Sequence, residues 1–150
     1  MSVRYAPRGS MRIEIETSLS EQTLADVRAG MRRYTESRVP WDEYTDLALV
    51  ARAGDGTVIA AALGETGRGW LHVSVVWVDE QARRQQLGTR LMNAMESEAI
   101  RRGCHSAYLD TFSYQARPFY EKLGYEVFGT LDDYPAGHQR FYMRKRLSKT

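Results

Sequence analysis

Several short runs along the chain are typical of β-strands, and the first of them alternates hydrophobic and polar residues with a period of two, as a half-buried strand does. The first run covers residues 11–17 and reads MRIEIET. Residues 46–53 and 57–64 form two further strand-like, largely apolar runs, and the tripeptide GDG between them is a strong hairpin signal. Residues 70–78, WLHVSVVWV, are rich in β-branched and aromatic side chains and therefore predict a central strand.

Two longer segments show a period of about 3.6 residues instead, which predicts amphipathic helices. The first spans residues 21–37, where Ser18 or Ser20 can act as the N-cap. Its apolar stripe consists of Leu24, Val27, Met31 and Tyr34. The second spans residues 86–102, and its apolar stripe consists of Leu87, Leu91, Met95 and Ala99. Gly103 follows directly and is expected to end this helix.

The rest of the chain is expected to form shorter elements. Strands are predicted at 104–112, 125–130 and 138–147, and a short helix at 115–123. We expect residues 1–10 to be a loose tail and residues 1–150 to form a single domain, because no repeat or linker interrupts the pattern. This mixture of strands and helices predicts an α/β or α+β fold.

The composition changes this picture little but excludes several classes of protein. Hydrophobic residues make up 43% of the chain and charged residues 27%, as in an ordinary globular protein. The formal net charge is only +2, with acids and bases interspersed, so neither a nucleic-acid nor a membrane partner is expected. The single cysteine, Cys104, cannot form an internal disulfide, and no zinc-site spacing occurs in the sequence. We therefore expect a cytoplasmic protein without a bound metal.

Candidate chemistry is concentrated in residues 76–92, VWVDEQARRQQLGTRLM, where a strand, a basic turn and a helix follow one another. The first backbone N–H groups of a helix have no partner within it and lie at its positive end, so such a turn can bind a phosphate. Arg83, Arg84 and Arg90 would add positive charge, and Gly88 would let a ligand approach the main chain closely. A solvated basic helix start explains the same pattern, so the pattern alone leaves both interpretations open.

Two segments resemble motifs of one known family, the GNAT family of N-acetyltransferases. Residues 83–88, RRQQLG, resemble the family's acetyl-coenzyme A signature Q/R-x-x-G-x-G/A, with Gln86 where the family usually has its first glycine. Residues 113–125, SYQARPFYEKLGY, are similar to the family's N-x-x-A-x-x-F/L-Y-x-K-x-G-F. Both segments occur in the family's order and at a suitable separation, and the resemblance is strongest over residues 70–130.

The resemblance implies a mixed, mostly antiparallel sheet of about six to seven strands, flanked by helices and splayed between its fourth and fifth strands. Acetyl-coenzyme A would lie in that opening, with its pantetheine arm along the strand at 70–78. An exposed strand edge offers donors and acceptors to the amides of such an arm. The resemblance assigns cofactor binding to Val76, Trp77, Val78, Arg83, Arg84, Gln86, Leu87, Gly88, Thr89, Ser113 and Tyr120.

The activity implied by the resemblance is transfer of an acetyl group to a primary amine of a small molecule, by direct attack in a ternary complex. An amine with a reference pKa of about 10.4 must lose a proton before it attacks, and the departing thiolate must gain one. By resemblance, Tyr120 is the general acid. The candidates for the general base are Asp110 in the first place and Glu43, Asp79 and His72 as alternatives.

The amine acceptor is expected to lie near the last loop of the chain and near aromatic residues. The candidate acceptor-binding residues are Tyr34, Trp41, Glu43, Asp110, Tyr134 and His138, and Trp70 is a further candidate. Two alternatives stay open: a protein or peptide amine as the acceptor, and a non-catalytic sensor that binds acyl-coenzyme A without turnover. Because dimers are common in the family, the resemblance is also compatible with a homodimer.

Overall fold

The computed structural model describes residues 9–147, except for the side chain of Arg84. Its internal contacts divide the chain into two units, residues 1–41 and 42–150, which are described separately. The single domain expected over residues 1–150 stays a prediction. Of the expected tail, residues 1–8 lie outside the described residues, and residues 9 and 10 belong to no helix or strand.

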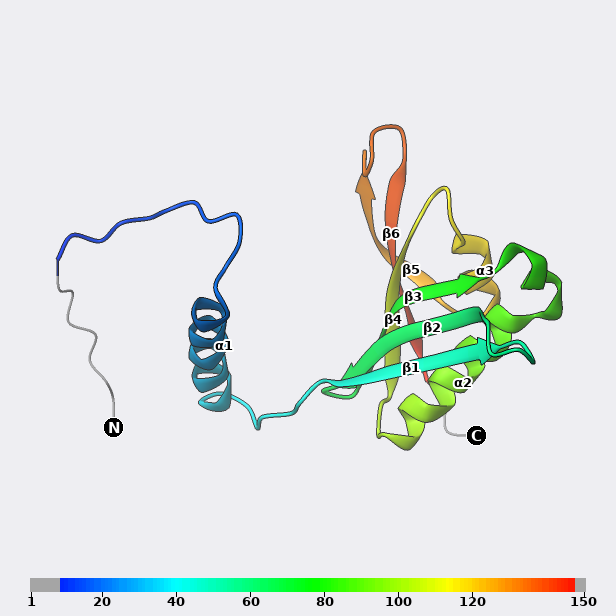
Figure 1. Ribbon diagram of the computed structural model, residues 1–150, viewed down its shortest axis with the longest axis horizontal. Coiled ribbons are helices and arrows are strands. Elements are labelled where there is room, and N and C mark those ends of the chain that lie inside the picture. The colour runs from blue at the N-terminus through cyan, green and yellow to red at the C-terminus, as the bar shows by residue number, and fades with distance from the viewer. Residues whose placement is uncertain (1–8, 148–150) are drawn as a thin grey trace. The chain divides into compact units, whose positions relative to one another are not determined.

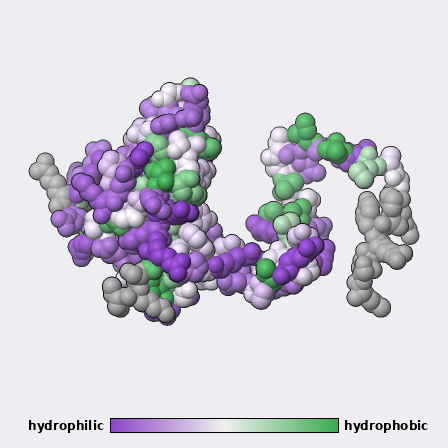
Figure 2. All heavy atoms as spheres, turned by 180° about the vertical axis from the view of Figure 1, so that it is seen from behind, coloured by the Kyte–Doolittle hydropathy of each residue, from purple (hydrophilic) through white to green (hydrophobic). Residues whose placement is uncertain are grey.

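The first unit contains one helix, α1 (Glu21–Glu36), which confirms the helix predicted at 21–37. Ser20 is its N-cap, and its side-chain oxygen accepts a hydrogen bond of 3.0 Å from the backbone N–H of Thr23. Such a cap satisfies one of the N–H groups that a helix start leaves unpaired. Within the described part of the chain no side chain of α1 is buried, and hydrophobic residues are visible on the surface of this unit (Figure 2).

The strand predicted at residues 11–17 is wrong. These residues, all of which the structure describes, form no strand, and the side chains of Ile13 and Ile15 are 96% and 97% exposed. A strand needs a partner for its backbone N–H and C=O groups, and a period-two pattern does not provide one. The alternation of residues 11–17 therefore does not by itself produce a strand.

The second unit is a six-stranded sheet with helices (Figure 1). Its strands are β1 (Thr45–Arg52), β2 (Val58–Gly67), β3 (Trp70–Val78), β4 (Ser106–Phe112), β5 (Glu126–Asp132) and β6 (Gln139–Arg146). Its helices are α2 (Leu87–Arg101), α3 (Arg117–Lys122) and the short 3₁₀ helix η1 (Glu80–Gln85). The spatial order is β1-β2-β3-β4-β6-β5, and only the β3–β4 pair is parallel. The mixed, mostly antiparallel sheet confirms the predicted fold class.

The core lies between one face of the sheet and α2, which packs against β1, β2 and β3. All four residues of the predicted stripe of this helix are buried, namely Leu87, Leu91, Met95 and Ala99. They meet the sheet residues Leu71, Val73, Leu109 and Met143. Burial of each large apolar side chain contributes about 1.5–3 kcal/mol to folding, so this face determines where α2 lies. Within residues 9–147 no helix is long and apolar enough to cross a membrane.

A β-bulge interrupts β3 at Ser74. Val73 and Val75 pair with consecutive residues of β2, the first of them with Gly64, so Ser74 is an extra residue in the ladder. Its hydroxyl donates a hydrogen bond of 3.0 Å to a backbone carbonyl of β2. A side chain at Gly64 would collide with the carbonyl oxygen of His72, which explains why glycine stands opposite the bulge.

The bulge marks the point where β3 and β4 part. The extra residue reverses the alternation of side chains, so that Val76 and Val78 pack on the core side, as Leu71 does before the bulge. Parallel pairing with β4 ends at Val73 and Leu109. The second half of β3 therefore has a partner on the β2 side only among the described strands, which confirms the predicted opening.

The end of α2 is tied to the sheet through one arginine. Arg102 donates hydrogen bonds to the carbonyl of Asp46 at 3.1 Å and to the hydroxyl of Thr66 at 3.0 Å. Its Nε also donates to Glu98 at 2.9 Å. Hydrogen bonds from Arg101 and Arg102 lower the pKa of Glu98 from 4.5 to about 2.

Candidate active site

A cavity of about 670 Å³ lies between the second half of β3, the junction of η1 with α2, and α3. We call it the helix-side cavity. It is lined by Val76, Trp77, Val78, Arg83, Gln86, Gly88, Thr89, Tyr114, Gln115, Ala116, Phe119 and Tyr120. Sites for small ligands measure roughly 300–1,000 Å³, so its size suits a small molecule or part of a cofactor.

The N-terminus of α2 borders this cavity and has the features of an anion site. Gln86 adopts a left-handed conformation with φ of 55°, and within the described chain its side chain makes no capping hydrogen bond. The N–H of Arg90 donates to the carbonyl of Gln86, as in the first hydrogen bond of an α-helix, so the N–H groups of the helix before it have no partner within α2. The first turn carries no acidic residue, and Arg83 adds positive charge.

Gly88 is part of this wall. A Cβ atom built on it would lie 3.2 Å from Cζ of Phe119 and 3.8 Å from Cγ2 of Val78. The absence of a side chain therefore lets α3 approach the start of α2 closely.

Tyr120 lies at the inner wall of the cavity and is buried, with 8% of its surface exposed. Burial, and secondarily the negative charge of Asp110, raise the pKa of its hydroxyl to about 12. Its ring makes edge contacts with Phe119 and Tyr125. The hydroxyl therefore keeps its proton at neutral pH.

The structure brings together most of the residues predicted to bind the cofactor. Eight of them line the helix-side cavity, namely Val76, Trp77, Val78, Arg83, Gln86, Gly88, Thr89 and Tyr120. The side chain of Leu87 lies in the core instead, so only its backbone remains for a ligand. Ser113 is outside the lining and its hydroxyl accepts a hydrogen bond of 3.0 Å from the N–H of Gln139. The side chain of Arg84 lies outside the described part of the structure.

Four lining residues were missed, namely Tyr114, Gln115, Ala116 and Phe119. All four belong to the segment 113–125 on which the family resemblance was based, so their position in that motif was the available signal.

Asp110 lies on β4 and forms an ion pair with Arg140 of β6. Nε and Nη2 of Arg140 each lie 2.8 Å from Oδ2 of Asp110. Nη1 of the same arginine donates a hydrogen bond of 3.0 Å to the hydroxyl of Tyr134. The structure thus joins two of the predicted acceptor residues, Asp110 and Tyr134, through an arginine that the sequence did not single out.

His138, another predicted acceptor residue, lies beside this group. Its Nδ1 is 3.2 Å from the hydroxyl of Ser113, and its ring meets Tyr114 edge-on. The ring of Phe112 stacks on both Tyr114 and Tyr134. The loop before β6 is therefore held against the end of β4 by aromatic contacts.

Three further residues were predicted to bind the acceptor. Tyr34 and Trp41 lie in the first unit, where they contact the guanidinium groups of Arg38 and Arg32, respectively. Glu43 lines a separate cavity near the start of β1.

Glu43, in that separate cavity, is one of the three alternative bases, and the other two, Asp79 and His72, have different surroundings. The carboxylate of Asp79 caps η1 by accepting the N–H of Gln81 at 2.9 Å, which is a structural role. His72 faces Glu65 across β2 and β3 and lines a second cavity of about 510 Å³, together with Trp70. Among the described residues no group of three His, Cys, Asp or Glu side chains could hold a metal ion.

Comparison with known proteins agrees with this geometry. Residues 14–125 match the acetyltransferase (GNAT) family. An acetyltransferase of Agrobacterium fabrum is 32% identical over 81% of this chain and 88% of its own length. Blasticidin-S acetyltransferase of Streptomyces morookaense is 30% identical over 87% of this chain and 94% of its own. The crystal structure of an acetyltransferase from Bacillus cereus superposes with a TM-score of 0.79 at 29% identity, over 90% of this chain and 98% of its own. The family match and the shared fold together show that this chain is an enzyme of the acetyltransferase (GNAT) family.

Proposed function

We propose that this enzyme transfers the acetyl group of acetyl-coenzyme A to a primary amine of a small molecule, by direct attack in a ternary complex. The observation that carries the proposal is the helix-side cavity, which joins an anion-binding helix start, a free strand edge and a buried tyrosine. Acetyl-coenzyme A supplies an acetyl group activated as a thioester.

The donors of the cavity fit the two ends of this cofactor. The N–H groups at the start of α2 and the guanidinium of Arg83 suit a diphosphate. The main chain of β3 from Val76 to Val78 pairs on the β2 side, and its other edge suits the amides of a pantetheine arm. Leu87 would contribute only its backbone.

Asp110 and Tyr120 carry the two proton transfers in this proposal. The amine would lose its first proton to solvent and attack as the neutral base. Its nitrogen would then bond to the acetyl carbon and give a second proton to Asp110, while the carbon–sulfur bond would break and the sulfur would receive the proton of Tyr120. Since Arg140 engages Oδ2 of Asp110, we assign proton acceptance to Oδ1. A pKa of about 12 makes Tyr120 a weak acid, but the same burial raises the proton affinity of a thiolate beside it.

Small-molecule acceptors are favoured by one relative. The Streptomyces protein at 30% identity is named for its action on blasticidin-S, a small molecule. We therefore propose a small amine as the acceptor here, in a cytoplasmic enzyme that could form a homodimer. A peptide acceptor and a non-catalytic sensor are the competing functions.

The first experiment separates these functions. Calorimetry with acetyl-coenzyme A should detect binding, and coenzyme A release should be measured over a panel of small amines and peptides. Turnover of a small amine supports the proposal, turnover of peptides alone supports the peptide acceptor, and binding without turnover supports the sensor. Absence of binding by folded protein would refute the cofactor site.

The second experiment tests the general acid. Tyr120→Phe should lower kcat about 100-fold, because a positioned acid contributes roughly 100- to 10,000-fold. The Michaelis constant for acetyl-coenzyme A should stay within about two-fold, since the ring remains. Tyr125→Phe is the matched control, because Tyr125 is buried next to Tyr120 but lies outside the cavity lining. Full activity of Tyr120→Phe would remove this tyrosine from the mechanism.

A further inference from the structure

One row of side chains crosses the sheet on the face opposite α2. The strand register pairs Glu65 with His72, His72 with Tyr108, Tyr108 with Arg144, and Arg144 with Glu126. Residues paired directly across neighbouring strands lie on the same face, so these five side chains form a continuous line over five strands. Most of this row borders a cavity of about 510 Å³, which we call the sheet-face cavity.

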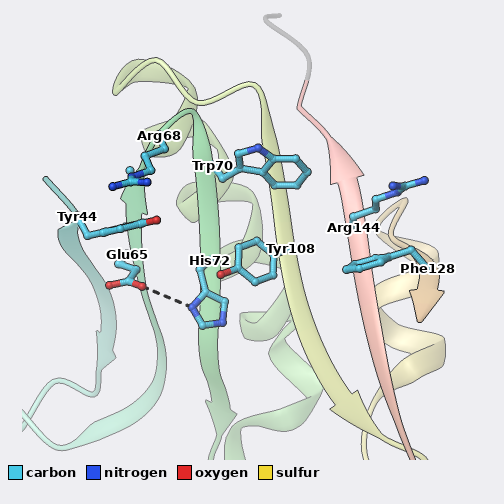
Figure 3. Close-up of a pocket in the computed structure, with 9 residues that line it drawn as sticks. Tyr44, Glu65, Arg68, Trp70, His72, Tyr108, Phe128 and Arg144 are labelled. Atoms are coloured by element: carbon cyan, nitrogen blue, oxygen red, sulfur yellow. Dashed lines mark ion pairs between the residues drawn. The ribbon is translucent and has the colours of Figure 1, made fainter. Parts of the chain in front are cut away.

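Aromatic rings form the walls of the sheet-face cavity (Figure 3). His72 stacks on Tyr108 with 4.6 Å between ring centroids, and Trp70 meets Tyr108 edge-on at 6.0 Å. Tyr44 closes the β2 side and Phe128 the β5 side. A Cβ atom on Gly67 would lie 2.6 Å from the ring of Tyr44, so the glycine allows this ring to lie against the strand.

Three charged side chains of the described residues line the cavity, namely Arg144, Arg68 and Glu65. Nε of Arg144 lies 3.1 Å from Oε1 of Glu126 and the guanidinium lies over the ring of Phe128, so the charge of Arg144 is balanced by Glu126. Cζ of Arg68 lies 5.6 Å from the centroid of the Tyr44 ring. Glu65 points into the cavity with Oε1 3.8 Å from Nδ1 of His72 (Figure 3). A carboxylate among aromatic faces is a favourable site for one ammonium group.

The number of carboxylates narrows the class of ligand further. Glu65 is the one carboxylate among the nine described residues that line the cavity, so a second or third positive charge on the ligand would have no counter-charge there. The aromatic walls favour a flat, apolar body instead. The cavity therefore suits a monoamine with a ring and disfavours polyamines.

The amine end of such a ligand would face the opening of the sheet. His72 lies two residues before the bulge at Ser74, where β3 and β4 part, and Val76 is the first residue of β3 that lines the helix-side cavity. Two residues of strand span about 7 Å and four about 13 Å, so the acyl end of the cofactor would meet the amine between the bulge and Val76. Trp70 and Tyr44 would then cover the ring at the far end.

We propose that the sheet-face cavity is the acceptor site, and that it binds a ring-bearing monoamine whose ammonium group is held by Glu65 beside His72. This inference rests on the proposed acetyltransferase function and names its substrate class. It assigns acceptor binding to four residues, of which the sequence had indicated only Trp70 for this role: Tyr44, Glu65, Trp70 and His72.

The test compares amines and variants in steady-state assays with acetyl-coenzyme A. 2-Phenylethylamine should have a Michaelis constant at least about ten-fold below those of n-butylamine and spermidine. Glu65→Gln should raise the Michaelis constant for 2-phenylethylamine about ten-fold, since a hydrogen bond to a charged group is lost. In Glu65→Gln the Michaelis constant for acetyl-coenzyme A should stay within about two-fold of the wild-type value. Trp70→Leu should raise the amine constant and Trp70→Phe should largely restore it.

Asp55→Asn is the matched control, because it removes one negative charge from the turn between β1 and β2, outside both cavities. An unchanged amine constant in Glu65→Gln, or a lower constant for spermidine than for 2-phenylethylamine, would overturn the inference while leaving the enzyme active. Failure of the proposed function looks different, since wild-type protein would then release no coenzyme A with any amine.

Discussion

The left-handed conformation of Gln86 allows a direct test of how the cofactor turn is built. Gln86 ends η1 and begins α2 with φ of 55° and ψ of 28°. In this region Cβ crowds the following backbone, at a cost of about 1–2 kcal/mol for residues other than glycine. Gln86→Gly removes Cβ, and part of the gain is offset because glycine loses more entropy on folding, by roughly 0.5–1 kcal/mol.

The comparison that isolates this effect is Gln86→Gly against Gln86→Ala. Both variants lack the glutamine side chain, but only alanine keeps Cβ. Where φ is positive, alanine is less stable than glycine by about 1 kcal/mol. For a chain of this length that difference corresponds to about 2–4 °C in Tm. Urea unfolding followed by far-ultraviolet circular dichroism measures the free energies, with equal m-values as the check on two-state behaviour.

The same substitution bears on the cofactor, because Gln86 lines the helix-side cavity. Removal of its side chain should leave the Michaelis constant for acetyl-coenzyme A unchanged or lower it, since the ligand can approach the backbone more closely. Equal unfolding free energies for the glycine and alanine variants would refute the reasoning, because Cβ strain would then be negligible at this turn.

Three further predictions concern the walls of the site and the helix that carries it. Gly88→Val should raise the Michaelis constant for acetyl-coenzyme A about ten-fold in steady-state assays, because the new side chain would push against Phe119 inside the cavity. Gly64→Ala should lower the unfolding free energy by about 2–3 kcal/mol in urea, since its Cβ would collide with the backbone opposite the bulge. Glu98→Gln should flatten the pH dependence of Tm at low pH. The pKa of Glu98 is lowered from 4.5 to about 2 in the folded protein, so its contribution is present above pH 4.5 and is lost as the pH falls towards 2.

Each of these predictions has its own check. Gly54→Ala is the control for Gly88→Val, since a Cβ there would meet open space. An unaltered Michaelis constant in Gly88→Val would place the cofactor elsewhere. Wild-type stability in Gly64→Ala would show that the bulge can adapt. Parallel Tm curves for wild type and Glu98→Gln between pH 5 and about 2.5 would contradict the role of the arginine pair.

Much of the second unit follows from local patterns in the sequence. The hairpin of β1 and β2, the apolar stripe of α2 and the glycine after that helix depend on residues close together in the chain, and all three are present. The two motif segments, 83–88 and 113–125, identified most of the helix-side cavity for the same reason. In such segments consecutive residues determine both the periodicity of burial and the type of turn.

Other features depend on which strands become neighbours, and the sequence carries no local sign of that. The sequence predicts strands both at 11–17 and at 57–64, yet only the second of these segments, which is β2, has strand partners in the described structure. The bulge at Ser74 and the row from Glu65 to Arg144 exist because residues far apart in the chain are paired across the sheet. Period-two alternation predicts which face of the sheet a side chain lies on. The pairing register determines which side chain it contacts on the neighbouring strand. The sheet-face cavity is therefore a product of strand pairing, and the phosphate turn a product of consecutive residues.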